Sequence, residues 1–458
     1  MALNDALFPI LLCLVFALLL YYRYAHSYFK RRGVPTVPPT FPFGNVASII
    51  FRTQSINAKI IDIYNALKPK GHSFGGIYFF TVPVFLPISV ELIRNILVKD
   101  FHHFDDRGIH FDEENDPVSA HLFSLYGEKW KKLRAKLSPA FTAGKIKYMF
   151  ESIRKCGDVM IDVLEEMVQK DDTIEIKDIL ARFTTDVIGS CAFGIECNSL
   201  RNSQAEFRVM GNRAFVHTRG DFIRNAVICA SPALAKKLGL SVFPSEVSRF
   251  FKSAVQDTIA FREKYDVTRN DFLQLLIKML QGESLEENRE ILIEEKSSVL
   301  TLNEATAQAF IFFLAGFETT STSMGFTILE LAINQDIQQK ARTEVMQALE
   351  KFDGNVTHDA IADLPYMEKV LLESLRKYPP APAYLRKCTK DYRIPGTDVI
   401  IPKNMTVLIP TMAVQRDPEY YPNPDVFDPE RFSEENKAMS KENAYIPFGA
   451  GPRKCIGN

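Results

Sequence analysis

The 458-residue sequence contains a single tryptophan, no CxxC pair among its seven cysteines and almost no net charge. Cysteine-based zinc sites and disulfide frameworks depend on paired or clustered cysteines, so this spacing argues against both and favours free thiols in a reducing compartment. Lysine and arginine (55) balance aspartate and glutamate (56), so we expect no nucleic-acid partner, which would normally demand a basic face. The histidines show no HExxH or other metal-ligand spacing. A hydrophobic content of 46% is enough to bury a large core.

An apolar run occupies the N-terminus. Ala6 to Tyr22 is almost entirely hydrophobic, and the basic cluster Lys30-Arg31-Arg32 follows it. Roughly 17 apolar residues span most of a ~30 Å hydrocarbon layer, and a basic cluster after the span places the following chain in the cytosol. A cleavable signal peptide is the alternative, but no small-x-small cleavage site follows the run. We therefore predict an uncleaved anchor over residues 1–32 in the endoplasmic reticulum membrane, with the lipid bilayer as a partner.

A proline-rich stretch comes directly after this anchor. Pro35, Pro38, Pro39 and Pro42 favour an extended, stiff backbone over residues 33–45. The stretch is either a plain spacer or a strut that fixes the angle of the body to the membrane. The remaining residues, 46–458, are expected to form one folded domain.

Helical patterns predominate in that domain. Residues 74–98 contain strand-like runs followed by an amphipathic helix, and 392–414 predict a strand hairpin with a Pro-Gly turn. Residues 128–280 are mostly helical in pattern, whereas 281–298 are polar and typical of an exposed loop or short helix. Thr301 and Glu304 form a capping box that begins an apolar helix reaching about Ala332. The predicted fold class is mainly α with small β-sheets, and this long helix should run through the core.

The strongest chemical signal is the ten-residue stretch from Phe448 to Gly457, which contains three glycines, Arg453 and Cys455. Glycines allow the backbone to approach a flat ligand closely, and neighbouring cations favour a thiolate. One alternative is a glycine-rich turn with a chance cysteine. Another is a nucleophilic cysteine, which would need a base and an orienting partner that no motif supplies.

This stretch resembles the haem-ligand loop of the cytochrome P-450 family. The resemblance implies a haem-dependent monooxygenase (an oxidoreductase) with haem b as cofactor, Cys455 as the iron ligand and O2 as co-substrate. It also implies the cytochrome P-450 fold, with the long central helix lying over the haem, here preceded by the N-terminal transmembrane helix.

The segment from Ala315 to Thr320 brings one glycine and two threonines into the middle of the long helix. These residues are unfavourable there by intrinsic propensity, and threonine hydroxyls can divert backbone hydrogen bonds and open a groove. In the family this groove holds O2, so the resemblance makes Glu318 a proton relay and Thr319 the hydrogen-bond donor to the bound oxygen. A helix kink without chemistry is the alternative.

The same resemblance implies further positions around the haem. It predicts cofactor contacts at Trp130, Arg134, Ala315, Arg386, Phe448, Arg453 and Gly457. It assigns a structural ion pair to Glu373 and Arg376, which lie i, i+3 on one helix face, together with Arg431. Gln415 stands where many relatives carry a histidine, which weakens one possible contact with a haem propionate.

Longer stretches, among them FHHFDDRG (101–108) and LSPAFTAGKIKYMF (137–150), resemble the insect microsomal family-six branch. That branch implies small lipophilic substrates: xenobiotics, plant allelochemicals, insecticides or endogenous lipids. It also implies electrons from an NADPH-cytochrome reductase, with cytochrome b5 as an optional second donor. Substrate contacts are predicted at Phe111, Leu122, Phe123, Phe313, Ala383 and Tyr384.

The sequence departs from the family at its C-terminus, because Asn458 lies only three residues beyond the predicted ligand. Members normally continue further, so we expect the coding sequence to be incomplete. Two other functions stay open: a haem-thiolate isomerase or dehydratase that needs no reductase, and a non-catalytic haem-binding protein.

Overall fold

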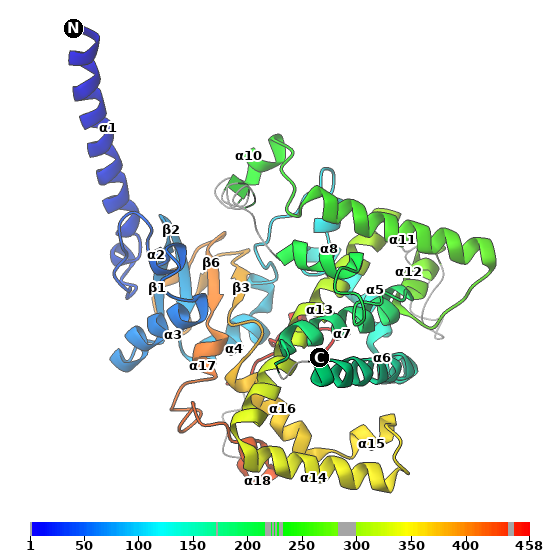
Figure 1. Ribbon diagram of the computed structural model, residues 1–458. Coiled ribbons are helices and arrows are strands. Elements are labelled where there is room, and N and C mark those ends of the chain that lie inside the picture. The colour runs from blue at the N-terminus through cyan, green and yellow to red at the C-terminus, as the bar shows by residue number, and fades with distance from the viewer. Residues whose placement is uncertain are drawn as a thin grey trace. The chain divides into compact units, whose positions relative to one another are not determined.

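The computed structural model describes residues 2–170, 173–215, 221, 224, 227–228, 232–282, 299–437 and 444–458 (Figure 1). Most of the predicted polar segment 281–298 therefore lies outside the described residues. The chain forms two compact units. The first consists of Met1–Gly108 and Leu375–Cys455, and the second of Ile109–Ser374 and Ile456–Asn458.

A four-stranded sheet organises the first unit. It contains β1 (Phe74–Phe79), β2 (Val82–Pro87), β3 (Tyr384–Lys387) and β6 (Thr406–Ile409) in the order β1-β2-β6-β3. The pairs β1–β2 and β3–β6 are antiparallel, whereas β2 and β6 run parallel. The predicted hairpin in 392–414 is present but shorter than expected, since only β4 (Tyr392–Arg393) and β5 (Ile400–Ile401) pair across the Pro-Gly turn. The chain after them joins the larger sheet as β6.

Short helices accompany this sheet in the first unit. They are α2 (Ala47–Ile50), α3 (Ile56–Leu67), α4 (Val90–Arg94), α17 (Thr411–Val414) and α18 (Glu434–Lys437). In α3 the buried side chains are Ile60, Ile63, Tyr64 and Leu67, which is the i, i+3, i+4, i+7 stripe of an amphipathic helix. The predicted amphipathic helix after the strands is confirmed as α4, which Ser89 caps and a π-helical turn over Asn95–Lys99 continues.

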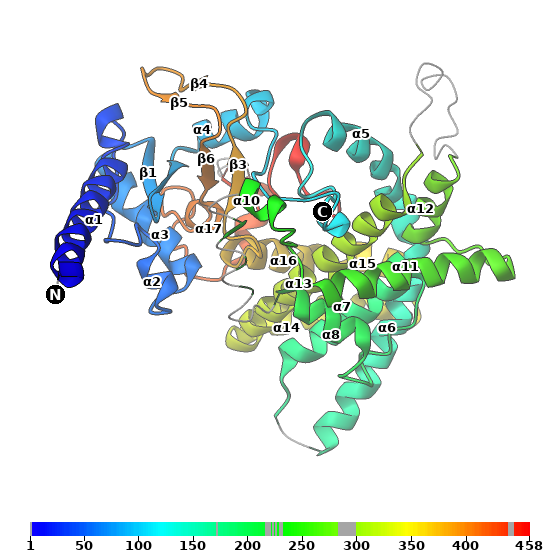
Figure 2. The ribbon, with the colours of Figure 1, turned by 90° about the horizontal axis from the view of Figure 1, so that it is seen from above.

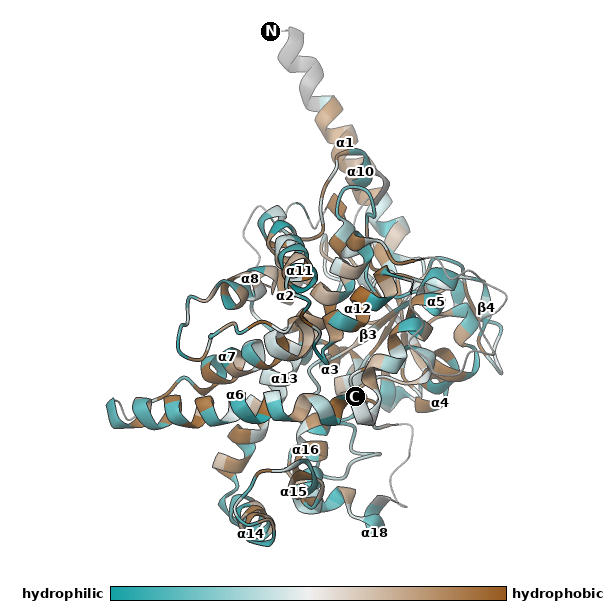
Figure 3. Ribbon diagram, turned by 90° about the vertical axis from the view of Figure 1, so that its right-hand side faces the viewer, coloured by the Kyte–Doolittle hydropathy of each residue, from teal (hydrophilic) through white to brown (hydrophobic). Residues whose placement is uncertain are grey.

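The N-terminal helix α1 (Ala2–His26) extends away from the sheet (Figure 1). Among the described residues, Pro9–Arg32 is the one stretch that is long and apolar enough to cross a membrane, and its residues 9–21 are all exposed. Figure 3 shows hydrophobic residues along most of the coloured part of this helix. An exposed apolar helix of this length is compatible with the predicted membrane anchor.

The second unit is built almost entirely of helices. They are α5 (Gly127–Leu137), α6 (Ala143–Lys170), α7 (Ile176–Ile188), α8 (Glu206–Phe215), α10 (Pro232–Lys237), α11 (Ser245–Tyr265), α12 (Phe272–Leu280), α13 (Leu302–Ile333), α14 (Gln335–Lys351) and α15 (His358–Ala362). The helix α16 (Pro365–Lys377) belongs to this unit up to Ser374. Few strands and many helices confirm the predicted fold class.

The long helix α13 lies at the centre of this unit and packs against α7, α8, α11, α12 and α14 (Figure 2). Its predicted start is confirmed, because Thr301 and Glu304 form the complete capping box. Its buried face carries Phe310, Phe313 and Phe317, whose rings pack with Phe251 of α11 or with one another. This aromatic cluster fixes α13 within the helical unit.

Candidate active site

Cys455 lies at the end of a tightly folded loop in the first unit. Its backbone N–H donates to the Phe448 carbonyl at 2.9 Å, which closes the loop. Gly449 and Gly451 both have positive φ, of 74° and 69°. A Cβ atom at 451 would overlap the carbonyl oxygen of Leu97, so only glycine fits there. The Cys455 side chain itself is exposed, so the loop presents its thiol outward from a closely packed backbone.

Several other described thiols, unlike that of Cys455, are buried or partly buried. Cys388 and Cys191 are buried, and burial raises the pKa of these thiols to about 11 and about 12. Partial burial likewise raises the pKa of Cys156 to about 11. Such groups stay protonated at neutral pH and make poor metal ligands, because the thiolate is the ligating form.

Tyr384 of β3 supports the cysteine loop. Its hydroxyl donates to the carbonyls of Ile446 and Pro447, at 3.1 and 2.5 Å, and its ring lies against Gly449. Burial raises the pKa of Tyr384, so the hydroxyl remains a donor. The residue was predicted as a substrate contact, and the structure engages its polar end with the loop instead. Its neighbour Ala383 is half-buried.

Two predicted propionate contacts, Arg386 and Arg453, are both 2% exposed. Arg386 donates from Nη1 to the neighbouring Leu385 carbonyl at 2.8 Å, and its Nε has no partner among the described residues. Burial lowers the pKa of Arg386 to about 10, so the group is still a cation at neutral pH. A buried guanidinium without a carboxylate in the described chain is costly unless an anionic ligand pairs with it. The first unit therefore fits a cofactor that carries acidic groups, as haem does.

Arg107 contributes a loop contact that sequence reasoning missed. Its guanidinium donates to the carbonyl of Arg453 at 3.1 Å, across 346 residues of sequence. Arg107 lies within the FHHFDDRG stretch, but nothing in the local pattern indicates its partner. The loop is thus supported by side chains from β3 and from the segment after α4.

The residues that were predicted to have a structural role are buried or hydrogen-bonded to backbone carbonyls. Glu373 and Arg376 are fully buried on α16, but Glu373 belongs to the second unit and Arg376 to the first, so their pairing stays a prediction. Arg376 donates to the carbonyls of Gln415 and Pro424, at 2.9 and 2.8 Å. Arg431 donates to the carbonyl of Asn423 at 3.0 Å. Both arginines therefore stabilise the irregular chain around residues 415–424.

In the second unit, α13 runs without interruption through the Ala315–Thr320 segment. The segment therefore does not break the helix, and a packing contact explains the glycine. A Cβ at Gly316 would come within 2.8 Å of Ile188, so the glycine lets α7 approach closely. The Thr319 hydroxyl does bond to the helix, donating to the Ala315 carbonyl at 2.5 Å. Ala315 and Thr319 are both exposed and share one face of α13.

Glu318 and Thr319 are not brought together. Adjacent residues on a helix project about 100° apart, and the Glu318 carboxylate lies 3.4 Å from the Lys177 ammonium on α7. Both partners of this ion pair keep contact with solvent, with side-chain exposures of 33% and 59%. Lys177 is a second residue that the sequence analysis missed, since 141 positions separate it from Glu318.

The remaining predicted contacts lie in several parts of the second unit. Trp130 is buried on α5 and Arg134 is half-buried one turn later, while Gly457 comes within van der Waals range of Phe141. Leu122 is buried, with its backbone N–H bonded to the Gln308 side chain, whereas Phe123 is 47% exposed. Phe111 is half-buried near Tyr126. Phe313 is fully buried inside the aromatic cluster and not on the exposed face of α13.

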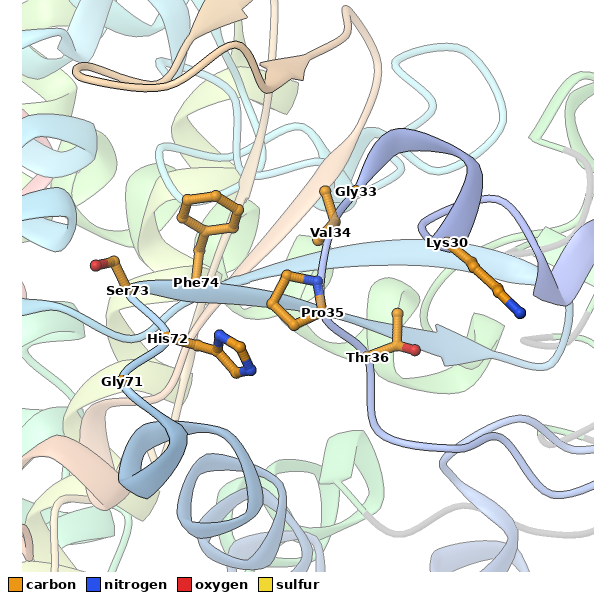
Figure 4. A pocket seen from close by; sticks show the side chains of 9 residues that line it. All are labelled: Lys30, Gly33, Val34, Pro35, Thr36, Gly71, His72, Ser73 and Phe74. Atoms are coloured by element: carbon orange, nitrogen blue, oxygen red, sulfur yellow. The ribbon is translucent and has the colours of Figure 1, made fainter.

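A separate hollow of about 610 Å³ lies at the base of α1 (Figure 4). It is lined by Lys30, Gly33, Val34, Pro35, Thr36, Gly71, His72, Ser73 and Phe74. No predicted site residue lines it, and Figure 4 shows its two ionisable side chains, Lys30 and His72, at opposite ends. It gathers no polar groups around one point, so we do not assign it to the active site.

Comparisons with known proteins define the class. The family model "Cytochrome P450" matches residues 35–458, so the chain belongs to this family. It is therefore an oxidoreductase of the cytochrome P450 monooxygenase class with haem as its cofactor.

Individual relatives define the branch. The chain is 42% identical to cytochrome P450 6a8 of Drosophila melanogaster, over 100% of this chain and 90% of the relative. It is 42% identical to cytochrome P450 6A1 of Musca domestica, over 96% of this chain and 86% of the relative. It is 41% identical to cytochrome P450 6a2 of Drosophila melanogaster, over 98% and 88% of the two chains. The predicted resemblance to the insect family-six branch is confirmed.

Proposed function

We propose that this protein inserts one atom of O2 into small lipophilic substrates, with Cys455 as the thiolate ligand of its haem iron. The balanced reaction is RH + O2 + 2e⁻ + 2H⁺ → ROH + H2O. The observation that carries this proposal is the exposed Cys455 thiol at the end of a loop that a backbone hydrogen bond closes and in which Gly451 packs too closely for a side chain. When bound, a thiolate-ligated haem supplies O2 activation, since the thiolate donates electron density that favours O–O cleavage.

The cations of the first unit would hold the acidic groups of the cofactor. Arg386 supports this role because it is buried, charged and without an ion pair in the described chain. Arg453, Phe448 and Gly457 belong to the same loop motif, and Trp130 and Arg134 lie on one face of α5. The family match supports their assignment as cofactor contacts, together with Ala315 on the exposed face of α13.

Thr319 and Glu318 would handle protons at different places. The Thr319 hydroxyl donates to Ala315 and lies on the exposed side of α13, where it can turn to donate to a ligand instead. Glu318 is held by Lys177 on the side of α7, with one third of its side chain in contact with solvent. This arrangement supports a relay in which Glu318 takes a proton from solvent and Thr319 holds one at the reacting oxygen.

Lipophilic substrates follow from the family-six relatives and from the apolar side chains among the predicted contacts. Phe111, Phe123 and Ala383 keep exposed or partly exposed surface that a substrate could cover, and buried Leu122 would support them. Candidate substrates are xenobiotics, plant allelochemicals, insecticides and endogenous lipids. Phe313 is packed in the aromatic cluster, so its proposed role is to support the helix α13 and not to contact a substrate.

The exposed apolar helix α1 supports an anchor over residues 1–32, followed by the linker 33–45 and the catalytic domain 46–458. We place the protein in the endoplasmic reticulum membrane, with its catalytic part in the cytosol. An NADPH-cytochrome reductase would supply the electrons, with cytochrome b5 as a second donor.

The test uses the membrane-bound protein with and without Cys455→Ser. The reduced carbon monoxide complex of the wild type should show the red-shifted absorption band of thiolate ligation, and turnover should require NADPH and reductase. Cys455→Ser should lose both, whereas Cys388→Ser, a change at a buried thiol outside the loop, should keep both. Retention of the band in Cys455→Ser would overturn the ligand assignment. Turnover of peroxides without NADPH would identify an isomerase or dehydratase, and a band without turnover would identify a haem-binding protein.

A further inference from the structure

Gln415 is a fully buried amide that follows α17 in the first unit. Its side-chain nitrogen donates to the carbonyls of Leu375 and Arg376, both at 3.0 Å. Its side-chain oxygen accepts the backbone N–H of Ile446 at 2.9 Å. A glutamine amide has two N–H donors, and both are used here, so Gln415 has no donor left for a cofactor.

The backbone of Gln415 is bonded as well. Its carbonyl accepts Nη1 of Arg376 at 2.9 Å, and its N–H donates to the carbonyl of Thr411 at 3.0 Å. The Gln415 side chain therefore donates to the Arg376 backbone, and the Arg376 side chain donates to the Gln415 backbone. The loss of one partner would leave buried polar groups of the other unsatisfied, which is the costly outcome for a hydrogen bond in a protein interior.

The hydrogen bonds of the Gln415 side chain connect two different parts of the first unit. Leu375 and Arg376 lie in the last turn of α16, where carbonyls have no partner within the helix. Ile446 lies at the entrance of the cysteine loop, and its own carbonyl accepts the N–H of Gly449 at 3.0 Å. The hydroxyl of Tyr384 donates to that same carbonyl at 3.1 Å. Gln415 thus connects the end of a helix to the first fixed peptide of the loop that ends in Cys455.

We propose that Gln415 is a positioning residue for the iron ligand, which it sets through Ile446 and the loop backbone. The inference rests on the proposed role of Cys455 as that ligand. A sulfur atom displaced from its place ligates weakly or as a neutral thiol, so the identity of the axial ligand reports the position of the loop. No side-chain contact between Gln415 and the cofactor is required.

The test compares Gln415→Glu with a matched control, Asn45→Asp. Asn45 is 4% exposed, and its amide nitrogen donates to the carbonyls of Val37 and Pro38 at 3.3 and 3.2 Å. Its amide oxygen accepts the N–H of Tyr78 at 2.8 Å. Each substitution keeps the side-chain shape and replaces two N–H donors by an oxygen that faces two carbonyls. Of the two side chains, only Gln415 is hydrogen-bonded to the entrance of the cysteine loop.

The readout is the fraction of the reduced carbon monoxide complex that lacks the thiolate band, measured on the full chain well below each unfolding temperature. Both variants should unfold at a lower temperature than the wild type. Gln415→Glu should raise the non-thiolate fraction about fivefold to tenfold, as expected for the loss of a buried hydrogen bond, and should shift the reduction potential of the iron. Asn45→Asp should leave both unchanged.

Gln415→His retains one N–H donor and should give an intermediate fraction, which keeps the test available if Gln415→Glu does not fold. Equal non-thiolate fractions in the Gln415 and Asn45 variants would overturn the positioning role. Absence of the thiolate band from the wild type and from Asn45→Asp would instead overturn the assignment of Cys455 as ligand. The two failures are therefore distinguishable.

Discussion

The cysteine loop of the first unit and the middle of α13 in the second unit carry two parts of the proposed chemistry, and they are stabilised in opposite ways. The loop has positive-φ glycines and depends on Tyr384, Arg107 and Gln415, residues far from it in sequence. The α13 segment is regular helix, and the Thr319 hydroxyl donates to the Ala315 carbonyl in its own preceding turn. Substitutions that disturb the loop should therefore cost stability and ligation together, whereas exposed substitutions on α13 should change catalysis alone.

Gly451→Ala should have the largest effect on stability. The new Cβ would overlap the Leu97 carbonyl and stand on a backbone with φ of 69°, so we expect a loss of about 3 kcal/mol in the free energy of unfolding. Gly396→Ala is the matched control, because Gly396 has φ of 75° but open space around it, and should cost about 1 kcal/mol. Chemical denaturation measures both. Equal losses would show that backbone conformation alone, not packing on Leu97, selects glycine at 451.

Glu318→Gln tests the expectation that substitutions on α13 change catalysis without a loss of stability. If Glu318 relays protons, kcat should fall about a hundredfold, in the range of general acid–base catalysis, with the unfolding temperature unchanged. Lys177→Gln should also preserve stability, since an exposed ion pair contributes little, but should lower kcat because it releases the Glu318 carboxylate from its position beside α7. Lys147→Gln, which breaks an exposed pair with Asp359, is the control and should do neither. A fall in unfolding temperature that parallels the fall in kcat would argue for a structural role of Glu318.

Arg386→Met should separate cofactor retention from protein stability. Removal of a buried cation that has no ion pair in the described chain should leave the cofactor-free protein at least as stable as the wild type. Haem should nevertheless dissociate about tenfold faster, because a charged hydrogen bond to the cofactor is lost. Transfer of haem to a scavenging protein measures this rate, with the exposed Arg393→Met as control. Unchanged haem retention would remove Arg386 from the cofactor contacts.

The smallest expected effect is a difference in labelling rate between Cys455 and the buried thiols. In haem-depleted protein at pH 8, an alkylating reagent should modify exposed Cys455 well before Cys156 or Cys388, whose pKa values burial raises to about 11. Reconstitution with haem should protect Cys455 and leave the slow labelling of the other two unaltered. Mass spectrometry of the labelled peptides identifies each site, and protection of Cys388 in its place would contradict the assignment.

Local signals in the sequence predicted local structure well. The capping box at Thr301 and Glu304 marks the start of α13, because a capping box acts within one turn of helix. The glycines around Cys455 predicted a tight loop for the same reason. At Gly316 the helix α13 continues without a break, and the glycine serves the close approach of α7.

Contacts between distant residues could not be predicted in this way. The pairs Lys177–Glu318 and Arg107–Arg453 span 141 and 346 positions, and each partner by itself looks like an ordinary charged residue. Gln415 looked like a weakened cofactor contact, whereas its amide is fully used by Leu375, Arg376 and Ile446. Only the three-dimensional arrangement reveals such partners.

The single tryptophan gives this protein a built-in optical probe. Trp130 is 5% exposed on α5, so all tryptophan emission comes from one buried ring at a position proposed to contact the cofactor. Haem absorbs where tryptophan emits, so cofactor loss should appear as recovered fluorescence, without a label or a substitution. The scarcity of tryptophan in the sequence thus makes the kinetics of haem release from the wild-type chain directly observable.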